Sequence, residues 1–285
     1  MERVAEGTEF MTYREALDNG EKILNTAGVP DARNDAWLLM AMACQIDHTF
    51  YYVHMGEQMA SEQMNSYESL ISKRAERVPL QYITGEQEFM GLRFHVNSNV
   101  LVPRQDTETL VEEALKRIVP GMKLMDMCTG SGCVLISILK NCQGVEGWGY
   151  DISKQALAVA KENAKLNDVA ANFEKSDLFE NVMDTYDMIV SNPPYIPTDE
   201  ILTLMPEVAQ FEPTIALDGK EDGLYFYRKI ISGCREFLNP DGMVLFEIGC
   251  EQGAAVSKML HYAGFSEVHV IQDLTHHDRV VFGKL

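Results

Sequence analysis

Short apolar segments alternate with longer amphipathic segments over the C-terminal part of the chain, and this alternation constrains the fold more than any other feature. Lys123–Met127 and Asp187–Ser191 are short, apolar and bounded by turn residues, which is typical of buried strands. Lys154–Asn167 instead carries apolar residues at helical spacing. Strands that alternate with helices form a mostly parallel sheet with helices on both faces. We therefore expect a doubly wound α/β fold.

The pattern predicts seven strands, the last two of which form a terminal hairpin. The expected strands are Lys123–Met127, Val145–Tyr150, Asn172–Lys175, Asp187–Ser191, Met243–Ile248, Val268–Gln272 and Arg279–Phe282. The last two are expected to pair antiparallel. The expected helices are Thr107–Ile118 with Asp106 as its cap, Cys133–Asn141, Lys154–Asn167, Tyr225–Leu238 and Gln252–Ala263.

The N-terminal part of the chain carries a different pattern. From Thr12 to Arg77 apolar residues recur at helical spacing in three segments, which predicts a small all-helical domain over residues 1–78. Residues 79–105 contain Gln87–Met90 and Leu92–Val96 on either side of a glycine, which predicts a linker with a β-hairpin. Residues 106–285 then form the alternating α/β domain.

The bulk properties exclude several classes of protein. No apolar run approaches the roughly 18 residues of a membrane-spanning helix, and the N-terminus lacks the apolar core of a signal peptide. The six cysteines show neither a CxxC pair nor histidines at metal-ligand spacing. We therefore expect a cytoplasmic protein with reduced thiols, no bound metal and no membrane association.

The net charge of −19 bears on the partner. Proteins that bind the phosphate backbone of nucleic acids favour basic patches, so this charge weighs against broad nucleic-acid binding. It is compatible with a small-molecule substrate or a basic protein substrate. Solubility alone explains such a charge equally well.

A glycine-rich turn joins the first expected strand to the next helix. Its residues are Asp126-Met127-Cys128-Thr129-Gly130-Ser131-Gly132-Cys133. Small residues let the backbone approach a ligand closely, and a helix N-terminus favours a negative group. The spacing is not that of a dinucleotide site, and no phosphate-loop lysine follows. The turn resembles the first motif of S-adenosylmethionine-dependent methyltransferases, and a tight turn without a ligand is the alternative.

Acidic residues end the next two strands. Asp151 follows the second strand, where a carboxylate can accept hydrogen bonds from both hydroxyls of a ribose. Capping the following helix is the alternative role for Asp151, although Ser153 competes for it. Asp177 follows the third strand and can accept a hydrogen bond from an adenine amino group, with Leu178 against the ring. An ordinary turn aspartate explains Asp177 equally well.

The tetrapeptide Asn192-Pro193-Pro194-Tyr195 directly follows the fourth strand. Proline has no backbone N–H, so this backbone presents carbonyl acceptors without amide donors of its own. The asparagine side-chain oxygen is a further acceptor, and the tyrosine ring can stack on a flat group. The tetrapeptide therefore suits a site that holds a planar NH2 group.

Taken together, these motifs resemble the HemK/PrmC family of release factor glutamine N5-methyltransferases. The resemblance covers nearly the whole chain. Outside the cofactor motifs it rests on the segments Pro79-Leu80-Gln81-Tyr82-Ile83-Thr84-Gly85, Phe89-Met90-Gly91-Leu92, Val102-Pro103-Arg104-Gln105-Asp106-Thr107-Glu108 and Phe211-Glu212-Pro213.

The resemblance implies a Rossmann-like S-adenosylmethionine-dependent methyltransferase domain, preceded by a helical domain that docks a peptide chain release factor. It implies S-adenosylmethionine as cofactor, S-adenosylhomocysteine as product, and no direct nucleic-acid contact. The cofactor would be bound by Asp126, Cys128, Thr129, Gly130, Ser131, Gly132, Asp151, Asp177, Leu178 and Asn192. The substrate glutamine would be held by Asn192, Pro193, Pro194, Tyr195 and Glu212.

Asn192, Pro193 and Tyr195 would be the catalytic residues. The Asn192 side-chain oxygen and the Pro193 carbonyl would accept hydrogen bonds from the two N–H groups of the glutamine amide. Tyr195 would pack on the amide plane. Glu212 would shape the pocket or position the substrate. An adenine-N6 or other exocyclic-amine nucleic-acid methyltransferase poses the same chemical problem and is the alternative. A non-catalytic binding protein that keeps the fold is a second alternative.

Two positions depart from the family pattern. Many members have an aromatic residue at the position of Leu178. The segment Thr275-His276-His277-Asp278-Arg279 lacks a glycine expected before Asp278. His276 and His277 are therefore interpreted as a surface turn rather than as metal ligands.

Overall fold

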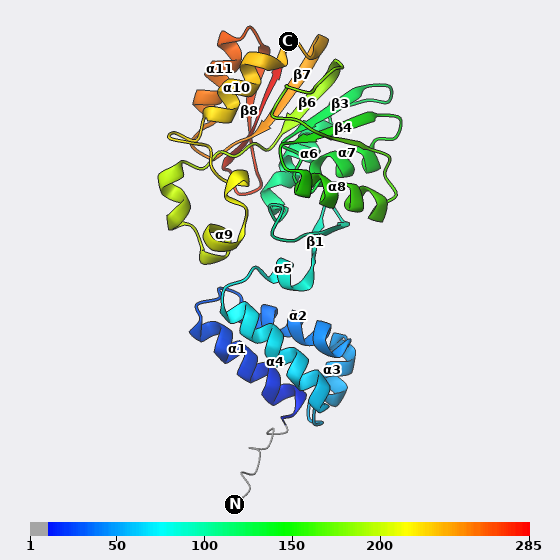
Figure 1. Cartoon of the computed structure of the whole chain (residues 1–285), viewed down its shortest axis with the longest axis vertical. Coiled ribbons are helices and arrows are strands. Elements are labelled where there is room, and N and C mark those ends of the chain that lie inside the picture. Colours follow the sequence, from blue (N-terminus) through cyan, green and yellow to red (C-terminus); the bar gives the residue numbers. More distant parts are fainter. Residues whose placement is uncertain (1–10) are drawn as a thin grey trace, which may run out of the picture. The chain divides into compact units, whose positions relative to one another are not determined.

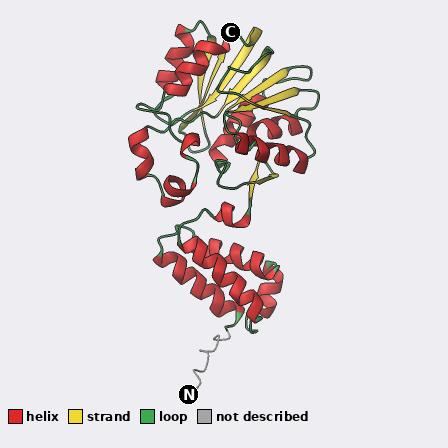
Figure 2. Cartoon of the chain, in the orientation of Figure 1, coloured by secondary structure: helices red, strands yellow, loops and turns green. Residues whose placement is uncertain are grey.

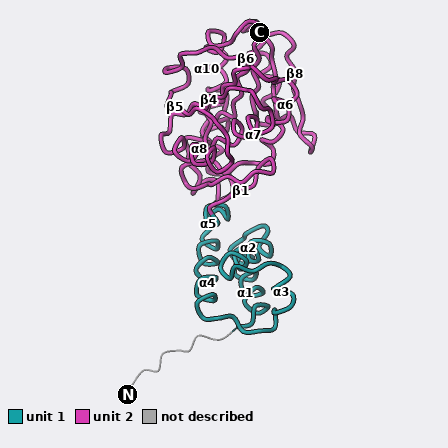
Figure 3. The backbone as a smooth tube through the Cα atoms, turned by 90° about the vertical axis from the view of Figure 1, so that its right-hand side faces the viewer, with its two compact units in different colours: residues 1–84 teal, residues 85–285 magenta. Residues whose placement is uncertain are grey.

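The structure is a computed structural model that describes residues 11–285. The chain divides into two compact units, Met1–Thr84 and Gly85–Leu285 (Figure 3). The division falls inside the segment that the sequence assigns to a linker. The expected absence of a signal peptide concerns residues 1–10, which lie outside the described residues.

The first unit is a helical bundle. Its helices are α1 (Tyr13–Thr26), α2 (Ala32–Cys44), α3 (His48–His54), α4 (Ser61–Ala75) and α5 (Leu80–Thr84). Helix α1 begins with a capping box, in which Thr12 and Glu15 each accept a hydrogen bond from the other's backbone N–H. The fully buried side chains include Leu24, Leu39 and Met40, so the apolar stripes of the helices meet in one core.

Two of these helices were not among the three predicted. Helix α3 is short, and Asp47 caps it by accepting a hydrogen bond from the backbone N–H of Phe50. Helix α5 is a single turn without a buried residue. Neither is long enough to show a clear apolar period.

The second unit opens with the predicted hairpin. Strands β1 (Glu86–Phe89) and β2 (Leu92–His95) pair antiparallel around Met90 and Gly91, both of which have positive φ. Asn163 holds the hairpin against helix α8 (Lys154–Leu166), because its side chain exchanges two hydrogen bonds with the backbone of His95. The hairpin thereby packs on the α/β core.

A seven-stranded sheet forms the centre of this unit (Figure 1). The spatial order is β5-β4-β3-β6-β7-β9-β8; β3 to β7 are parallel and β9 is antiparallel to both neighbours. The fold class predicted from the alternation is therefore confirmed. The strands are β3 (Lys123–Met127), β4 (Glu146–Asp151), β5 (Asn172–Lys175), β6 (Tyr186–Ser191), β7 (Leu238–Glu247), β8 (Ser266–Gln272) and β9 (Asp278–Lys284).

Helices cover both faces of the sheet (Figure 2). One apolar core lies beneath α6 (Glu108–Leu115), α7 (Cys133–Asn141) and α8 (Lys154–Leu166). A second core lies beneath α10 (Tyr225–Cys234) and α11 (Gly253–Tyr262). Between β6 and α10 the chain forms helix α9 (Pro206–Phe211) and two 3₁₀ turns, Thr198–Thr203 and Thr214–Ala216.

Two boundaries differ from the prediction. Helix α10 ends at Cys234, and β7 begins at Leu238, because Leu238 pairs with Tyr186 across an irregular register. Asp106 does not cap α6. It lies in a 3₁₀ turn, Gln105–Thr107, and its carboxylate pairs with the Arg279 guanidinium at 3.0 Å.

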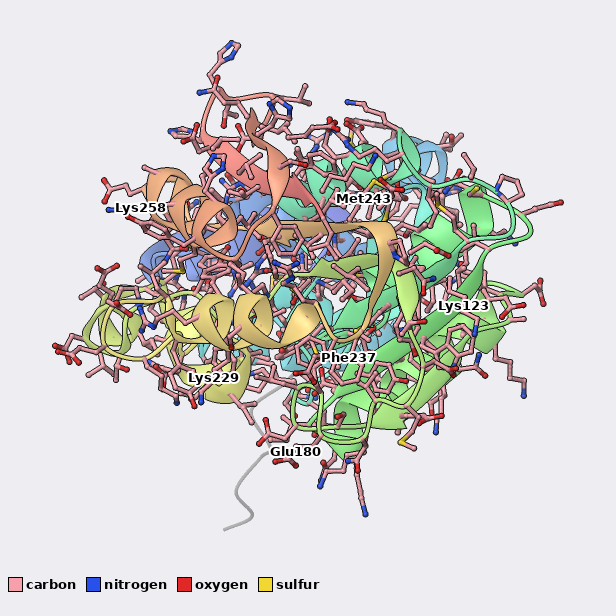
Figure 4. The ribbon with its side chains drawn as sticks, turned by 90° about the horizontal axis from the view of Figure 1, so that it is seen from above. Lys123, Glu180, Lys229, Phe237, Met243 and Lys258 are labelled. Carbon is pink, nitrogen blue, oxygen red and sulfur yellow. The ribbon has the colours of Figure 1, made fainter. Side chains whose placement is uncertain are left out.

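The strand order places a crevice beside β3. The chain runs from β3 to β4 and β5 on one side of β3 and then crosses back to β6 on its other side, so the order of the strands reverses beside β3. Ligands of such sheets bind at the carboxyl ends of the strands where the order reverses. Lys123 begins β3 and Phe237 precedes β7, so both mark the opposite, amino edge (Figure 4).

Candidate active site

A cavity of about 350 Å³ opens at the carboxyl ends of β3, β4 and β6. Of the residues predicted to bind cofactor, all except Gly132 line it. Asn192 and Pro194 of the tetrapeptide line it as well, whereas Pro193, Tyr195 and Glu212 do not. The structure therefore gathers motifs from the ends of four strands, β3, β4, β5 and β6, around one space.

The glycine-rich turn bends sharply at the end of β3. Cys128, Gly130 and Gly132 all have left-handed φ values, of 63°, 55° and 78°. A Cβ atom on Gly130 would meet no atom within 4 Å, so the backbone is open there. A Cβ atom on Gly132 would lie 3.1 Å from the Cβ of Ala160, so Gly132 serves close packing with α8.

Asp126 organises this turn from inside. Its carboxylate accepts a hydrogen bond from the Thr129 hydroxyl at 2.6 Å, and Asp126 is only 1% exposed. Burial, reinforced by the Asp151 charge, raises the pKa of the Asp126 carboxyl to about 7, against the opposing hydrogen bond from Thr129. A positive charge in the cavity would stabilise the ionised form.

Asp151 joins the ends of β3 and β4. Its Oδ2 accepts from the backbone N–H of Gly130 and its Oδ1 from that of Ser153, each at 2.9 Å. Ser153 itself caps α8 by accepting from the backbone N–H of Ala156, so Asp151 is not the helix cap. Burial raises the pKa of Asp151. Each carboxylate oxygen keeps a further lone pair for a ligand.

The turn after β5 borders the cavity at Asp177 and Leu178. Asp177 is exposed, and Leu178 has a left-handed φ of 48°. The Ser176 hydroxyl donates to the Leu178 carbonyl at 2.5 Å and so holds this conformation. The turn presents an apolar side chain next to an acid.

The Asn192–Tyr195 segment is held at both ends. The Asn192 Nδ2 donates to the Thr107 hydroxyl at 3.3 Å, and the Tyr195 hydroxyl donates to Glu247 Oε1 at 3.2 Å. The Gln252 Nε2 donates to the Tyr195 carbonyl at 2.9 Å. Within residues 11–285, Asn192 Oδ1 makes no hydrogen bond, so it remains an acceptor for a ligand.

Close packing against two glycines also fixes this segment. A Cβ atom on Gly219 would lie 2.8 Å from the Tyr195 Cα, and one on Gly223 would lie 2.3 Å from the Tyr195 carbonyl oxygen. Only glycine therefore fits against the Tyr195 backbone. The tetrapeptide is a rigid wall of the site.

Sequence reasoning missed Glu247, the last residue of β7. It is 1% exposed, and burial raises the pKa of its carboxyl to about 7, although Thr107 and Arg279 lower it. The sequence feature that could have identified Glu247 is its place as the acidic residue inside the apolar segment Met243–Ile248.

Sequence reasoning also gave no role to Arg104 and Thr107, although both line the cavity. Arg104 forms an ion pair with Glu212, whose side chain is only 1% exposed. Burial raises the pKa of Glu212, and Arg104 opposes that rise. Both residues lie in the segment Val102–Glu108, on which the family resemblance partly rests. That resemblance could have identified them as candidates for the site.

The described residues contain neither a metal-binding cluster nor a helix that could cross a membrane. No group of three or more His, Cys, Asp or Glu side chains within residues 11–285 is arranged to hold a metal ion. Within the same residues no helix has the length and apolar character of a bilayer span.

Two solved structures share the fold. A methyltransferase from Pyrococcus furiosus aligns with a TM-score of 0.52 and 16% identity, over 68% of this chain and 89% of that one. The T. thermophilus 16S rRNA N2 G1207 methyltransferase, solved with AdoMet and guanosine, aligns with a TM-score of 0.52 and 15% identity, over 70% of this chain and 49% of that one. The second unit therefore has a methyltransferase fold.

Sequence relatives are closer and cover the chain. Residues 15–85 match the PrmC N-terminal domain, and residues 104–207 match the methyltransferase small domain. A release factor glutamine methyltransferase from Geobacter sulfurreducens is 39% identical over 99% of this chain and 100% of its own length. One from Clostridium acetobutylicum is 38% identical over 95% of this chain and 98% of its own length. The predicted resemblance is thus confirmed, and the chain belongs to the release factor glutamine methyltransferase family.

Proposed function

We propose that the protein transfers a methyl group from S-adenosylmethionine to the side-chain amide nitrogen, N5, of the glutamine in the Gly-Gly-Gln motif of peptide chain release factors. One observation carries the proposal. The Asn192 Oδ1 is an unused acceptor on a rigid backbone wall, beside a glycine turn and the Asp151 carboxylate. The relatives named above act on release factors, and this substrate class follows from them.

The cavity fits S-adenosylmethionine. The open backbone at Gly130 leaves room for close approach, Asp151 has lone pairs for ribose hydroxyls, and Leu178 offers an apolar surface for adenine. The buried Asp126 favours a positively charged ligand. When bound, this cofactor supplies an electrophilic methyl group on a sulfonium. The residues proposed to hold it are Asp126, Cys128, Thr129, Gly130, Ser131, Asp151, Asp177, Leu178 and Asn192. Gly132 does not line the cavity and instead lets the turn pack closely against α8.

The difficult partner is the glutamine amide, whose nitrogen lone pair is delocalised into its carbonyl. We propose that Asn192 Oδ1 and the Pro193 carbonyl oxygen accept hydrogen bonds from the two N–H groups of this amide. They orient the nitrogen and stabilise the positive charge that develops on it. Pro194, which lines the cavity, forms the wall against which the amide lies, and Tyr195 holds this wall from behind through its hydrogen bond to Glu247. No buried base is needed, because the alkylated amide is a strong acid and loses its proton readily.

Glu212 is proposed to act through Arg104. Its carboxylate is buried and paired with the Arg104 guanidinium, and Arg104 in turn lines the cavity. Glu212 therefore fixes the one arginine that the described cavity lining contains. We propose that Arg104 then contacts backbone carbonyls of the substrate loop beside the target glutamine.

The helical unit is proposed to dock the release factor. Its helices α2 and α3 expose large apolar side chains, with Met42 47%, Tyr52 67% and Val53 71% exposed. The double variant Tyr52→Ala/Val53→Ala should raise KM for a whole release factor but not for a short Gly-Gly-Gln peptide. Val119→Ala, an exposed residue of the other unit, is the matched control. An unchanged KM for the whole factor would remove this role.

Methyl-labelled S-adenosylmethionine tests the function directly. The protein is incubated separately with a release factor, with DNA and with RNA, and mass spectrometry then locates the label. Label on the Gly-Gly-Gln glutamine is expected, with turnover reduced roughly 10²-fold in Asn192→Ala. Label on a nucleic-acid base alone would instead establish the nucleic-acid activity. We also propose a cytoplasmic location, which a release factor substrate supports because release factors act on ribosomes there.

A further inference from the structure

Both polar ends of the Asn192–Tyr195 segment lead to one buried carboxyl group. The Tyr195 hydroxyl donates to Glu247 Oε1 at 3.2 Å. The Asn192 Nδ2 donates to the Thr107 hydroxyl at 3.3 Å, and Thr107 in turn stabilises the charged form of Glu247. Glu247 does not line the cavity, so it cannot touch a ligand there and must act through these neighbours.

Chemistry fixes which group donates and which accepts in each of these contacts. An ionised carboxylate only accepts, and a threonine hydroxyl has one proton to donate. Because the Thr107 oxygen accepts from Asn192, its proton is free for Glu247. The Glu247 Oε2 is buried and makes no hydrogen bond in the described residues, so it is an acceptor open to that proton. The NH2 of Asn192 therefore faces Thr107, and its Oδ1 is left for the cavity.

We propose that Glu247 is a positioning residue for methyl transfer, which through Thr107 and Tyr195 makes Asn192 present its oxygen, not its NH2, to the substrate. The inference rests on the proposed function, because only an NH2 substrate requires an acceptor there. A site that presented the Asn192 NH2 would instead favour a carboxylate.

Two neighbours favour the ionised, accepting form of Glu247 against the effect of its burial. Burial raises the pKa of its carboxyl to about 7, while the Thr107 hydroxyl and the Arg279 guanidinium lower it. The other groups that face it are Tyr195, Asp106, Tyr227 on α10 and Cys133 on α7. Below about pH 7 the carboxyl gains a proton and can donate to Thr107, which releases the orientation of Asn192. The acceptor is therefore lost as pH falls.

The test compares binding of two peptides to the full-length protein with S-adenosylhomocysteine present. One peptide carries Gly-Gly-Gln and the other Gly-Gly-Glu, and calorimetry gives both affinities. The wild type should prefer glutamine by roughly 10-fold or more. Glu247→Gln should lose that preference. The NH2 group of the new glutamine can donate to the Thr107 oxygen, and the Thr107 proton can then be donated to Asn192 Oδ1. A merely structural role would weaken both peptides alike.

Two variants of Thr107, Thr107→Val and Thr107→Ser, test whether its hydroxyl is the group that matters. The valine keeps the shape but removes the hydroxyl, so it should lose the preference for glutamine and lower kcat by roughly 10-fold or more. The serine keeps the hydroxyl and should restore both. In the wild type kcat should fall below about pH 7, and in Glu247→Gln that acidic limb should disappear.

An unchanged glutamine preference in Thr107→Val or in folded Glu247→Gln would overturn the inference. If Glu247→Gln does not fold, the comparison of valine with serine at position 107 decides alone. A wild type that neither binds nor methylates the glutamine peptide would overturn the proposed function, and the inference with it. The two failures are therefore distinguishable.

Discussion

The Asp151 Oδ2 accepts a hydrogen bond from the backbone N–H of Gly130 at 2.9 Å, which ties the glycine turn to the end of β4. The same carboxylate is proposed to hold the cofactor ribose. One residue therefore shapes the turn and binds the ligand. Any change at Asp151 should disturb both functions together.

Asp151→Asn tests this double role. One of the two side-chain positions becomes an NH2 group, which cannot accept from the N–H of Gly130 or of Ser153. We expect the dissociation constants for S-adenosylmethionine and S-adenosylhomocysteine both to rise roughly 10-fold or more, as for loss of a hydrogen bond to a charged group. Calorimetry measures this, with the exposed Asp199→Asn as control. Unchanged affinities would show that Asp151 has no part in binding.

The backbone at Cys128 predicts an unusual order of stability. Cys128 has a φ of 63°, a conformation that favours glycine. Cys128→Gly and Cys128→Ala both remove the thiol, but only glycine adopts this φ freely. We expect the glycine variant to be more stable by about 1 kcal/mol in urea unfolding, whereas alanine is better at ordinary positions. An alanine variant more stable than the glycine variant would show that the backbone at Cys128 is not strained.

The sequence predicted most of the sheet and the site residues at its carboxyl edge. Parallel strand ends converge at that edge, so the sequence alone predicts that Asp151 and Asn192 lie close together. Thr107 and Glu247 could not, because their roles depend on tertiary contacts. Thr107 is 85 positions from Asn192, and periodicity detects only local neighbours. The start of β7 was misjudged because Asn239-Pro240-Asp241-Gly242 has the composition of a turn, yet it lies within the strand.

The Arg104–Glu212 pair predicts a stability pattern that a double variant can reveal. Arg104→Ala leaves the buried Glu212 carboxylate without its partner, which should cost about 1–3 kcal/mol of unfolding free energy. Adding Glu212→Gln removes the buried charge and should recover much of that loss. Denaturant unfolding of both single variants and the double variant measures the coupling. Additive effects would mean that the pair does not interact.

Glu247 predicts a dependence of stability on pH. Its pKa is raised from 4.5 to about 7 in the folded protein, so the fold favours the neutral carboxyl. The stability that this group contributes is present below about pH 4.5 and is lost as pH rises through about 7, a change on the order of 3 kcal/mol. Glu247→Gln lacks this change. The Tm of the variant minus that of the wild type should therefore increase between about pH 5 and pH 8.

Asp126 predicts that the two forms of the cofactor respond differently to pH. Burial and the Asp151 charge raise the pKa of Asp126 to about 7, so this carboxyl is partly protonated near neutral pH. The sulfonium of S-adenosylmethionine is positive and favours the ionised carboxyl, whereas the sulfur of S-adenosylhomocysteine is neutral. Each unit by which the sulfonium lowers this pKa corresponds to roughly tenfold tighter binding above it.

The affinity for S-adenosylmethionine should therefore increase between about pH 6 and pH 8, and that for S-adenosylhomocysteine should increase much less. Asp126→Asn should remove the difference between the two slopes, because its side chain does not titrate. Calorimetry at several pH values measures all four curves. Parallel slopes for the two ligands in the wild type would show that the sulfonium does not sense Asp126.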